Sequence, residues 1–426
     1  MSDQRWLIQS VDLATGLPEI TLPHQAAGVH LQLWWRACPI GQLWLPRETL
    51  PMASGELLRE AARQASSPVG DRLFRHGFRA PLPVIGDNPA RDTSPDFSSL
   101  AGLTHPLAQL VFPPLPSSPV PTVSIIICTR RRSGDLRRCL ASLAQLDPPP
   151  AEILVVNNDP SDESTRDVAQ SFPGIQCVDE PQPGLSRARN TGLRNVTGDI
   201  IAWTDDDTVA LPKWVEAIRR VFLDPAISGM TGLVLPGSLE TPSQLRFERD
   251  FGGFNRGYRA ITFDPRFFSE MKDRGVPVWM VGAGANMAFR RSVFEKLGGF
   301  DERLGAGAAG CSEDSEFWYR MLNAGLSLRY EPLAVVDHFH RVDEEGFSSQ
   351  MVAYMRGHVF ALLVQYEKYG HSGNLRRLFL SLPRYYWGVI CGRLEGGERG
   401  TIASEILGCL EGVGAYLIQV LRRGLR

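Results

Sequence analysis

Three consecutive aspartates, Asp205, Asp206 and Asp207, are the residues whose type and spacing most directly suggest chemistry. They follow the apolar segment 200–204, which predicts a buried strand. Three carboxylates at a strand end repel one another unless a positive charge lies between them. A hard divalent cation that shares a nucleotide diphosphate as ligand would remove this repulsion. The alternative is a solvated acidic turn.

Two further segments carry candidate functional groups. Glu313 and Asp314 begin a segment typical of a helix, and the N-terminus of a helix favours negative charge. Taken alone, this pair is explained more simply by helix capping than by catalysis. His338 and His340 are separated by one residue, so in a strand they lie on the same face. One of them could ligate a metal, and the alternative is an ordinary histidine of the surface or of a cleft.

The elements expected around these residues alternate between strands and helices. Such alternation predicts an α/β domain with a mainly parallel sheet, in which ligands bind at the carboxyl ends of the strands. We expect strands at 123–128, 152–156, 175–178 and 200–204, and helices at about 135–143 (capped by Asp135), 164–171 and 186–194. Polar clusters follow three of these strands, at 129–132, 157–159 and 205–207.

In this order, the segments resemble glycosyltransferase family 2, the inverting enzymes of the GT-A fold. The resemblance covers about residues 121–345 and implies a Rossmann-like, mainly parallel sheet. Its motifs are Val-Ser-Ile-Ile-Ile-Cys-Thr-Arg from 123, Val-Val-Asn-Asn-Asp from 155, Gly-Leu-Ser-Arg-Ala-Arg-Asn-Thr-Gly from 184, the Asp triplet, Gly-Ala-Gly-Ala-Asn-Met-Ala-Phe-Arg-Arg from 282, Gly-Gly-Phe-Asp-Glu from 298, and the Glu313–Asp314 pair.

The resemblance implies a set of donor-binding residues for a nucleotide-diphosphate sugar. Asn157 and Asn158 stand where the family carries an acidic residue that binds the base, so the identity of the base stays open. Small residues around Gly284 let the backbone approach a ligand closely. The full donor-binding set is Thr129, Arg130, Asn157, Asn158, Arg189, Asn190, Asp205, Asp206, Gly284 and Asn286.

The resemblance also assigns the metal and the base. Asp207 is expected to be the main ligand of Mg²⁺ or Mn²⁺, Asp205 to serve the metal or the ribose, and His338 to complete the site. Asp314 is expected to be the general base that deprotonates the acceptor hydroxyl, with Glu313 as its neighbour or as an acceptor contact. A single inverting displacement needs one base and no nucleophilic carboxylate.

Composition bounds the function. The chain has 426 residues, 43% of them hydrophobic, and a formal net charge of −2, so no overall positive field points to nucleic acid. Its seven cysteines are scattered and contain no C-x-x-C pair, which argues against a disulfide framework or a zinc site. The N-terminus lacks the pattern of a signal peptide, and the best apolar stretch, around 400–421, is interrupted by two glutamates. We therefore expect a cytoplasmic protein, with possible peripheral contact at the inner face of the membrane.

Other functions are weighed against the sugar transferase. A nucleotidyltransferase acting on a sugar phosphate is disfavoured because 129–133 lacks a glycine run, and a dinucleotide dehydrogenase because no G-x-G-x-x-G follows the first strand. A non-catalytic sugar-binding protein is supported only by Asn157 and Asn158. The acceptor is left open as a glycan, as in polysaccharide biosynthesis, a lipid-linked sugar or a small molecule.

The expected domain organisation has four parts. A small β-rich accessory domain spans 1–112, with a hairpin of 29–37 and 42–45 and a helix at 56–64. A Pro-rich linker (113–121), a GT-A domain (122–345) and a helical C-terminal region (346–426) follow. The aromatic, Gly-rich stretch 245–280 is either a sugar-binding lid or a core insertion. The C-terminal region carries eight Arg against four Glu from 371 onward, which suits either an anionic membrane or a second subunit.

Overall fold

The structure is a computed structural model that describes residues 5–75, 115, 119–392 and 401–424. Most of the expected Pro-rich linker and residues 76–112 of the expected accessory domain lie outside the described residues. The chain divides into two compact units. The first unit comprises 1–116, 238–242 and 257–260, and the second comprises 117–237, 243–256 and 261–426.

The first unit is built on a three-stranded sheet in the order β1-β2-β3. The predicted hairpin is confirmed as β2 (Gly28–Trp35) and β3 (Cys38–Pro46), but its turn lies at 36–37, where Arg36 takes a φ of 54°. The sequence did not predict β1 (Trp6–Asp12), which pairs in parallel with β2. The predicted helix is longer than expected and forms α1 (Ser54–Arg75).

Two short segments that are distant in sequence complete the first unit. The backbone N–H of Trp6 donates to the carbonyl of Leu239 at 2.9 Å. The hydroxyl of Tyr258 donates to Oε1 of Gln42 at 3.0 Å. The first unit is therefore assembled from three separate stretches of the chain.

The second unit contains a nine-stranded sheet. The predicted parallel strands are present: β4 pairs with β5 and β7, and β5 pairs with β6. Runs of Val and Ile bury most of both faces of β4, β5 and β7, as in covered parallel sheets, whereas the edge strand β6 is only partly buried. β9 and β12 are also parallel, whereas β11 runs antiparallel between β7 and β9. The order is β10-β12-β9-β11-β7-β4-β5-β6, with β8 paired to β12. The bounds are β4 (Val123–Thr129), β5 (Glu152–Asn157), β6 (Ile175–Asp179), β7 (Ile200–Asp205), β8 (Thr208–Ala210), β9 (Ile227–Pro236), β10 (Ile261–Phe263), β11 (Asn286–Arg290) and β12 (Ser327–His338).

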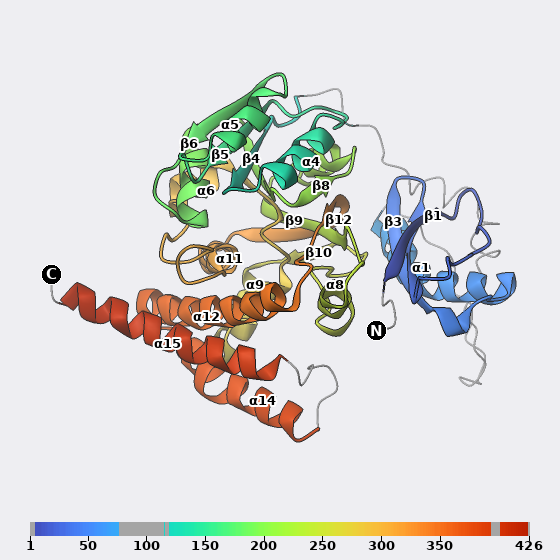
Figure 1. Cartoon of the computed structure of the whole chain (residues 1–426). Helices are drawn as coiled ribbons and strands as arrows, with labels where there is room; N and C mark the ends of the chain where they lie inside the picture. Colours follow the sequence, from blue (N-terminus) through green and yellow to red (C-terminus); the bar gives the residue numbers. More distant parts are fainter. Residues whose placement is uncertain (1–4, 76–114, 116–118, 393–400, 425–426) are drawn as a thin grey trace. The chain divides into compact units, whose positions relative to one another are not determined.

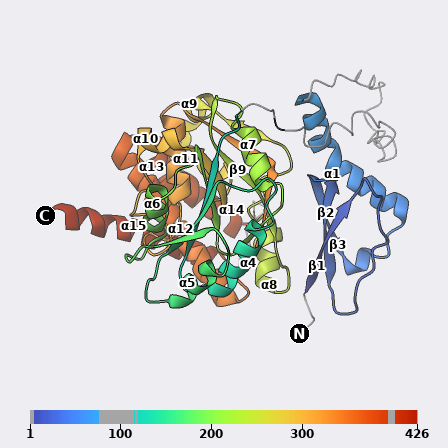
Figure 2. The ribbon, with the colours of Figure 1, turned by 90° about the horizontal axis from the view of Figure 1, so that it is seen from above.

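Helices cover this sheet, and α4 and α5 lie side by side (Figures 1 and 2). The apolar positions predicted for α4 are buried, but Asp135 is not its N-cap. Arg132 holds the N-cap position, and Asp135 lies in the first turn, where it pairs with Arg132 and Arg138. The helices are α4 (Ser133–Leu143), α5 (Glu163–Gln170), α6 (Leu185–Arg194), α7 (Trp214–Val221), α8 (Pro242–Leu245), α9 (Pro265–Met271), α10 (Arg291–Leu297) and α11 (Glu313–Asn323), with short helical turns at η2 (Arg246–Asp250), η3 (Lys272–Arg274) and η4 (Val278–Met280).

An aromatic core fixes the elements that carry the candidate site. Trp203 of β7 contacts the rings of Phe289, Phe294 and Phe300, with centroids 5.5–5.9 Å apart. Phe317 of α11 packs against the same three phenylalanines at 4.9–5.0 Å. Aromatic burial of this kind holds the end of β7 and the start of α11 in a fixed relation.

The C-terminal region is helical. It consists of α12 (Glu344–Tyr369), α13 (Ser372–Arg376), η5 (Arg377–Ser381), α14 (Leu382–Ile390) and α15 (Ile402–Gly424). α15 lies along α12 (Figure 1), and Gly408 and Gly412 allow the close approach. A Cβ at either glycine would come within 2.4–2.6 Å of a backbone carbonyl of α12. Among the described helices, the segment Ile402–Arg423 is long and apolar enough to cross a membrane by length and composition alone.

Candidate active site

The three aspartates after β7 have different environments. Asp206 is buried and accepts from Thr129 Oγ1 at 2.7 Å and from Arg132 Nη1 at 2.6 Å. Burial raises the pKa of Asp206 to about 7, and Arg132 offsets this effect only in part. Asp205 and Asp207 remain partly open to the site. The triplet is therefore not a solvated turn, and its central member serves the fold.

A chain of polar contacts leads from Asp207 into the interior. Nε2 of His338 lies 3.2 Å from Oδ1 of Asp207, and its Nδ1 lies 3.0 Å from Nδ1 of His340. Nε2 of His340 contacts Oε1 of Glu248 at 2.5 Å. Burial disfavours the charged ring of His338, but Asp207 and Asp205 outweigh this and raise its pKa. Burial lowers the pKa of His340, despite the neighbouring Glu248. We name Asp207, His338, His340 and Glu248 the histidine relay.

A divalent metal fits the outer end of the histidine relay. Ligand atoms of Asp205, Asp207 and His338 all lie within 4.8 Å of one another. Oδ2 of Asp207 accepts from Arg132 at 2.8 Å, while Oδ1 is buried and receives no well-formed hydrogen bond within the described residues. His338 and Arg132 outweigh the effect of burial and hold the pKa of Asp207 below its usual range. An ionised carboxylate with an unsatisfied oxygen, beside a second carboxylate and an imidazole, is a donor set that suits Mg²⁺ or Mn²⁺.

Arg189 joins the aspartates to the acidic pair of α11. This buried side chain contacts Glu313 Oε1 at 2.5 Å and Asp205 Oδ1 at 3.5 Å. Glu313 is buried as well, so its charge is neutralised locally. Burial raises the pKa of Glu313 although Arg189 opposes it. The arrangement leaves Asp314 as the carboxylate of the pair without an ion-pair partner in the described part of the chain.

Asp314 faces the cavity from the first turn of α11. The N-cap position belongs to Ser312, which takes a φ of 70°, so neither acidic residue caps the helix. Oδ1 of Asp314 accepts from the backbone N–H of Ser315 at 2.6 Å. Burial raises the pKa of Asp314, and Arg189 reduces this rise. A Cβ at Gly284 would lie 2.9 Å from Oδ2 of Asp314, so this glycine permits the close approach.

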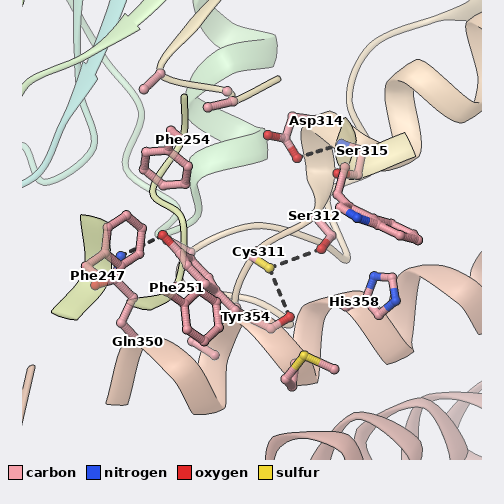
Figure 3. Close-up of a pocket in the computed structure, with 18 of the residues that line it drawn as sticks. Phe247, Phe251, Phe254, Cys311, Ser312, Asp314, Ser315, Gln350, Tyr354 and His358 are labelled. Carbon is pink, nitrogen blue, oxygen red and sulfur yellow. Dashed lines mark hydrogen bonds between the residues drawn. The ribbon is translucent and has the colours of Figure 1, made fainter. Parts of the chain in front are cut away.

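These groups line one cavity of about 1080 Å³ in the second unit. Of the candidate site residues, it brings together Arg189, Asp205, Asp207, Gly284, Glu313, Asp314 and His338. Phe247, Phe251 and Phe254 of the aromatic stretch also line it, and Figure 3 shows them across the cavity from Asp314. Phe247 is buried, whereas Phe251 is 41% exposed, so the stretch is partly core and partly cavity wall.

Three candidate donor-binding amides are used by the fold itself. Asn158 donates to the carbonyls of residues 180 and 182 and accepts from the N–H of residue 184. Asn190 bonds both backbone groups of Phe300, at 2.8 and 3.0 Å. Asn286 accepts from Trp214 Nε1 and donates to the carbonyls of residues 233 and 334. None of the three lines the cavity.

The candidate residues at the ends of β4 and β5 lie outside the cavity wall. Thr129 is buried and bonded to Asp206, and Asn157 accepts from the N–H of residue 159. Arg130 is half exposed and lies 3.7 Å from Asp159. Arg132, two residues further on, is the arginine that contacts Asp206 and Asp207. The sequence offered three adjacent arginines and no signal to choose among them.

Two other residues of the site were missed. Glu248 lies 90 positions before His338 and has no motif of its own. Arg256 lines the cavity from the aromatic stretch, and its Nε is buried without a hydrogen bond in the described structure. The signal that could have found them was the density of aromatic and charged residues between 245 and 258.

Fold and site together define an α/β protein of the GT-A class, with an acidic cluster at the carboxyl end of a parallel strand. Residues 124–298 match the sequence profile of glycosyl transferase family 2.

Relatives with curated descriptions carry related names. The pre-mycofactocin glycosyltransferase of Mycobacterium tuberculosis is 27% identical over 249 residues, which cover 58% of this chain and 49% of that protein. The glucosyl-dolichyl phosphate glucuronosyltransferase of Haloferax volcanii is 28% identical over 191 residues, 43% of this chain and 57% of that protein. The chain thus spans about half the length of these relatives. A mannosyltransferase from Pyrobaculum calidifontis, solved with GDP-mannose and Mn²⁺, aligns over 70% of this chain and 88% of its own with 19% identity and a TM-score of 0.45.

Proposed function

We propose that the protein transfers a sugar from a nucleotide-diphosphate sugar to an acceptor hydroxyl with inversion, and that it requires Mg²⁺ or Mn²⁺. The observation that carries this proposal is the single cavity that holds Asp205, Asp207 and His338 together with Asp314. One group of residues suits a metal and a diphosphate, and the other offers a carboxylate to an acceptor.

The donor side is electrostatic. Asp205, Asp207 and His338 would hold the metal, which when bound neutralises charge that grows on the departing diphosphate. Arg132 fixes one oxygen of Asp207 and so orients the other toward the site. Arg189 adds a buried positive charge beside Asp205.

The acceptor side depends on Asp314. Its carboxylate would accept the proton of the attacking hydroxyl, and its raised pKa makes it a stronger base than an exposed aspartate. Glu313 would act as a positioning residue, because its carboxylate is bound to Arg189 rather than turned toward the cavity centre.

The test is a panel of nucleotide-diphosphate sugars with Mg²⁺, Mn²⁺ or EDTA, read as nucleotide release. We expect one donor to release nucleoside diphosphate only when metal is present. We expect Asp207→Asn to abolish this metal-dependent release. Release of pyrophosphate from a nucleoside triphosphate and a sugar phosphate would replace the proposal with a nucleotidyltransferase. Tight donor binding without release in the presence of acceptor extracts would favour a sugar-binding protein.

We also propose that the exposed side of α15 contacts the membrane surface peripherally. One face of this helix packs on α12, while Leu410 and Leu421 are each 66% exposed and Arg422 and Arg423 follow at its end. Flotation with vesicles that contain anionic lipid tests this, comparing the full chain with Leu410→Gln/Leu421→Gln. Equal flotation of both contradicts membrane contact, and loss of a dimer in the variant would assign the face to a second subunit.

A further inference from the structure

The cavity extends from the acidic site to the C-terminal helices. Its wall there is formed by Tyr354 and His358 of α12, Arg377 of η5, and Tyr385 and Tyr386 of α14. Figure 3 shows Tyr354 and His358, both from α12, below Asp314 in the view. This end is aromatic, and no candidate donor or metal residue lies in it.

Arg377 is a charged side chain at this end of the cavity, and only part of its guanidinium has a hydrogen-bond partner. Its guanidinium stacks on Trp279, with the central carbon 3.7 Å from the ring centroid. Its Nε donates to Nε2 of His358 at 3.1 Å. Burial lowers the pKa of His358 to about 3, so this ring is a neutral acceptor. Within the described residues, neither Nη atom has a hydrogen bond and no carboxylate lies within ion-pair distance.

Two buried arginines of the second unit, Arg189 and Arg320, show the contrast. Arg189 pairs with Glu313 at 2.5 Å, and Arg320 pairs with Glu316 at 2.8 Å. Glu405 also lines the cavity, but its Oε1 accepts from Thr401 at 2.8 Å. A half-buried cation without a counter-charge is costly unless a ligand supplies one.

We propose that Arg377 binds an anionic group of the acceptor, a phosphate or a carboxylate, at the end of the cavity formed by the C-terminal helices. This rests on the proposed function in that the cavity is taken to receive an acceptor. The stacked guanidinium presents its two Nη groups as a planar fork, which matches the oxygens of either anion.

The anion can belong to a lipid or to a water-soluble sugar. Residues next to Arg377 favour neither by themselves, but exposed apolar side chains follow it closely in sequence. They are Phe379, Leu380, Trp387 and Ile390, between 51% and 64% exposed. An alkyl chain attached to the bound anion would find apolar surface there, whereas a soluble sugar phosphate would gain nothing from it.

The experiment measures binding without turnover, so it does not depend on sugar transfer. ³¹P NMR linewidths of inorganic phosphate and of octyl phosphate are titrated with the full-length protein, in EDTA and without nucleotide. We expect Arg377→Gln to weaken binding by about tenfold or more. Arg376→Gln is the matched control, because it removes the same charge from the adjacent exposed position. We expect it to change binding by less than about twofold.

The two phosphate probes and the Arg377 variants distinguish a lipid anion from a soluble one, and a failure of this proposal from a failure of the proposed sugar transfer. A loss seen with octyl phosphate alone assigns the site to an amphiphilic acceptor, and an equal loss with both probes assigns it to a soluble anion. Arg377→Lys keeps the charge but not the stacked fork, and we expect intermediate binding from it. If both Arg377 variants melt as the unaltered protein does and bind both probes equally well, the proposal is overturned. A negative donor panel with intact Arg377-dependent binding would instead overturn only the transferase.

Discussion

The two ends of the cavity satisfy their charges in opposite ways. At the acidic end, Asp206, Asp207 and Glu313 each meet an arginine, and the histidine relay anchors His338 from behind. At the C-terminal end, Arg377 stacks on an aromatic ring and has no carboxylate partner in the described residues. Where arginines neutralise the carboxylates, the acidic end keeps a fixed geometry, which suits the proposed metal and diphosphate. Where the chain leaves a cation incomplete, it selects for charge on the incoming molecule.

The largest expected effect comes from Asp314→Asn. Removing a general base should lower kcat by about 10³-fold, within the range for acid–base catalysis. Nucleotide affinity should stay unchanged because the donor-side groups remain in place. Steady-state kinetics and a nucleotide titration check this, with Asp273→Asn as the exposed control. Equal losses of affinity and turnover would place Asp314 on the donor side and erase the distinction between the two ends.

Asn286→Ala should act on stability rather than on donor affinity. The variant removes three buried hydrogen bonds that tie β11 to β9, β12 and α7. We expect a loss of about 2–4 kcal/mol in the free energy of unfolding, since buried carbonyls lose their donors. Denaturant unfolding measures it. Asn195→Ala, which removes one partly buried hydrogen bond from an exposed residue to residue 191, should cost far less. If the Asn286→Ala protein is as stable as the unaltered protein but binds the donor weakly, Asn286 is a donor-binding residue rather than a structural one.

Glu248→Gln tests whether the histidine relay supports the metal. Carboxylates that orient a ligating histidine from behind affect metal affinity by about 10–100-fold, and we expect the lower end here because two imidazoles intervene. Titration with Mn²⁺, followed by paramagnetic resonance, measures this directly. Glu270→Gln, on the exposed surface of α9, is the control. Unchanged Mn²⁺ affinity with a lowered melting temperature would make the relay a purely structural feature.

The smallest predicted effect is on the pH profile. A carboxylate base acts only when deprotonated, and burial raises the pKa of Asp314. The acidic limb of kcat/KM should therefore lie at higher pH than for an exposed aspartate, with activity falling as pH drops through the pKa of the folded state. Donor affinity measured over the same range shows whether the limb belongs to catalysis. A limb that follows donor affinity would assign it to Asp205 instead.

The sequence predicted the parallel half of the sheet well, for a physical reason. β4, β5 and β7 are short apolar runs followed by polar residues, and most of each run is buried, whereas β6 is a partly buried edge strand. β11 and β1 were missed because their pairing is set by distant partners: β11 is inserted antiparallel between β7 and β9, and β1 pairs with a strand that follows it by 16 residues.

The sequence predicted which acidic residues lie together at the cavity, but not which of the candidate amides and arginines line it, and the roles of all of them stay predictions. Asp205, Asp207, Asp314 and His338 lie together because strand ends and helix starts meet at one edge of the sheet. An amide that binds a ligand and an amide that satisfies a backbone carbonyl look alike in sequence, as Asn286 shows. Which arginine of 130–132 turns inward depends on the start of α4, where Arg132 holds the N-cap position.

The first unit includes residues 238–242 and 257–260, which lie far from its other residues in the sequence. This limits where the chain can be cut into fragments that fold. A cut in the Pro-rich stretch would leave the N-terminal fragment without Leu239 and Tyr258, the partners of Trp6 and Gln42. The remaining fragment would carry two orphaned segments on either side of 243–256, the stretch that supplies Phe247 and Phe254 to the cavity and Glu248 to the histidine relay. A fragment that is exchanged between relatives or expressed alone should therefore not be cut at the Pro-rich stretch. Such a cut separates residues 238–242 and 257–260 from the rest of the first unit.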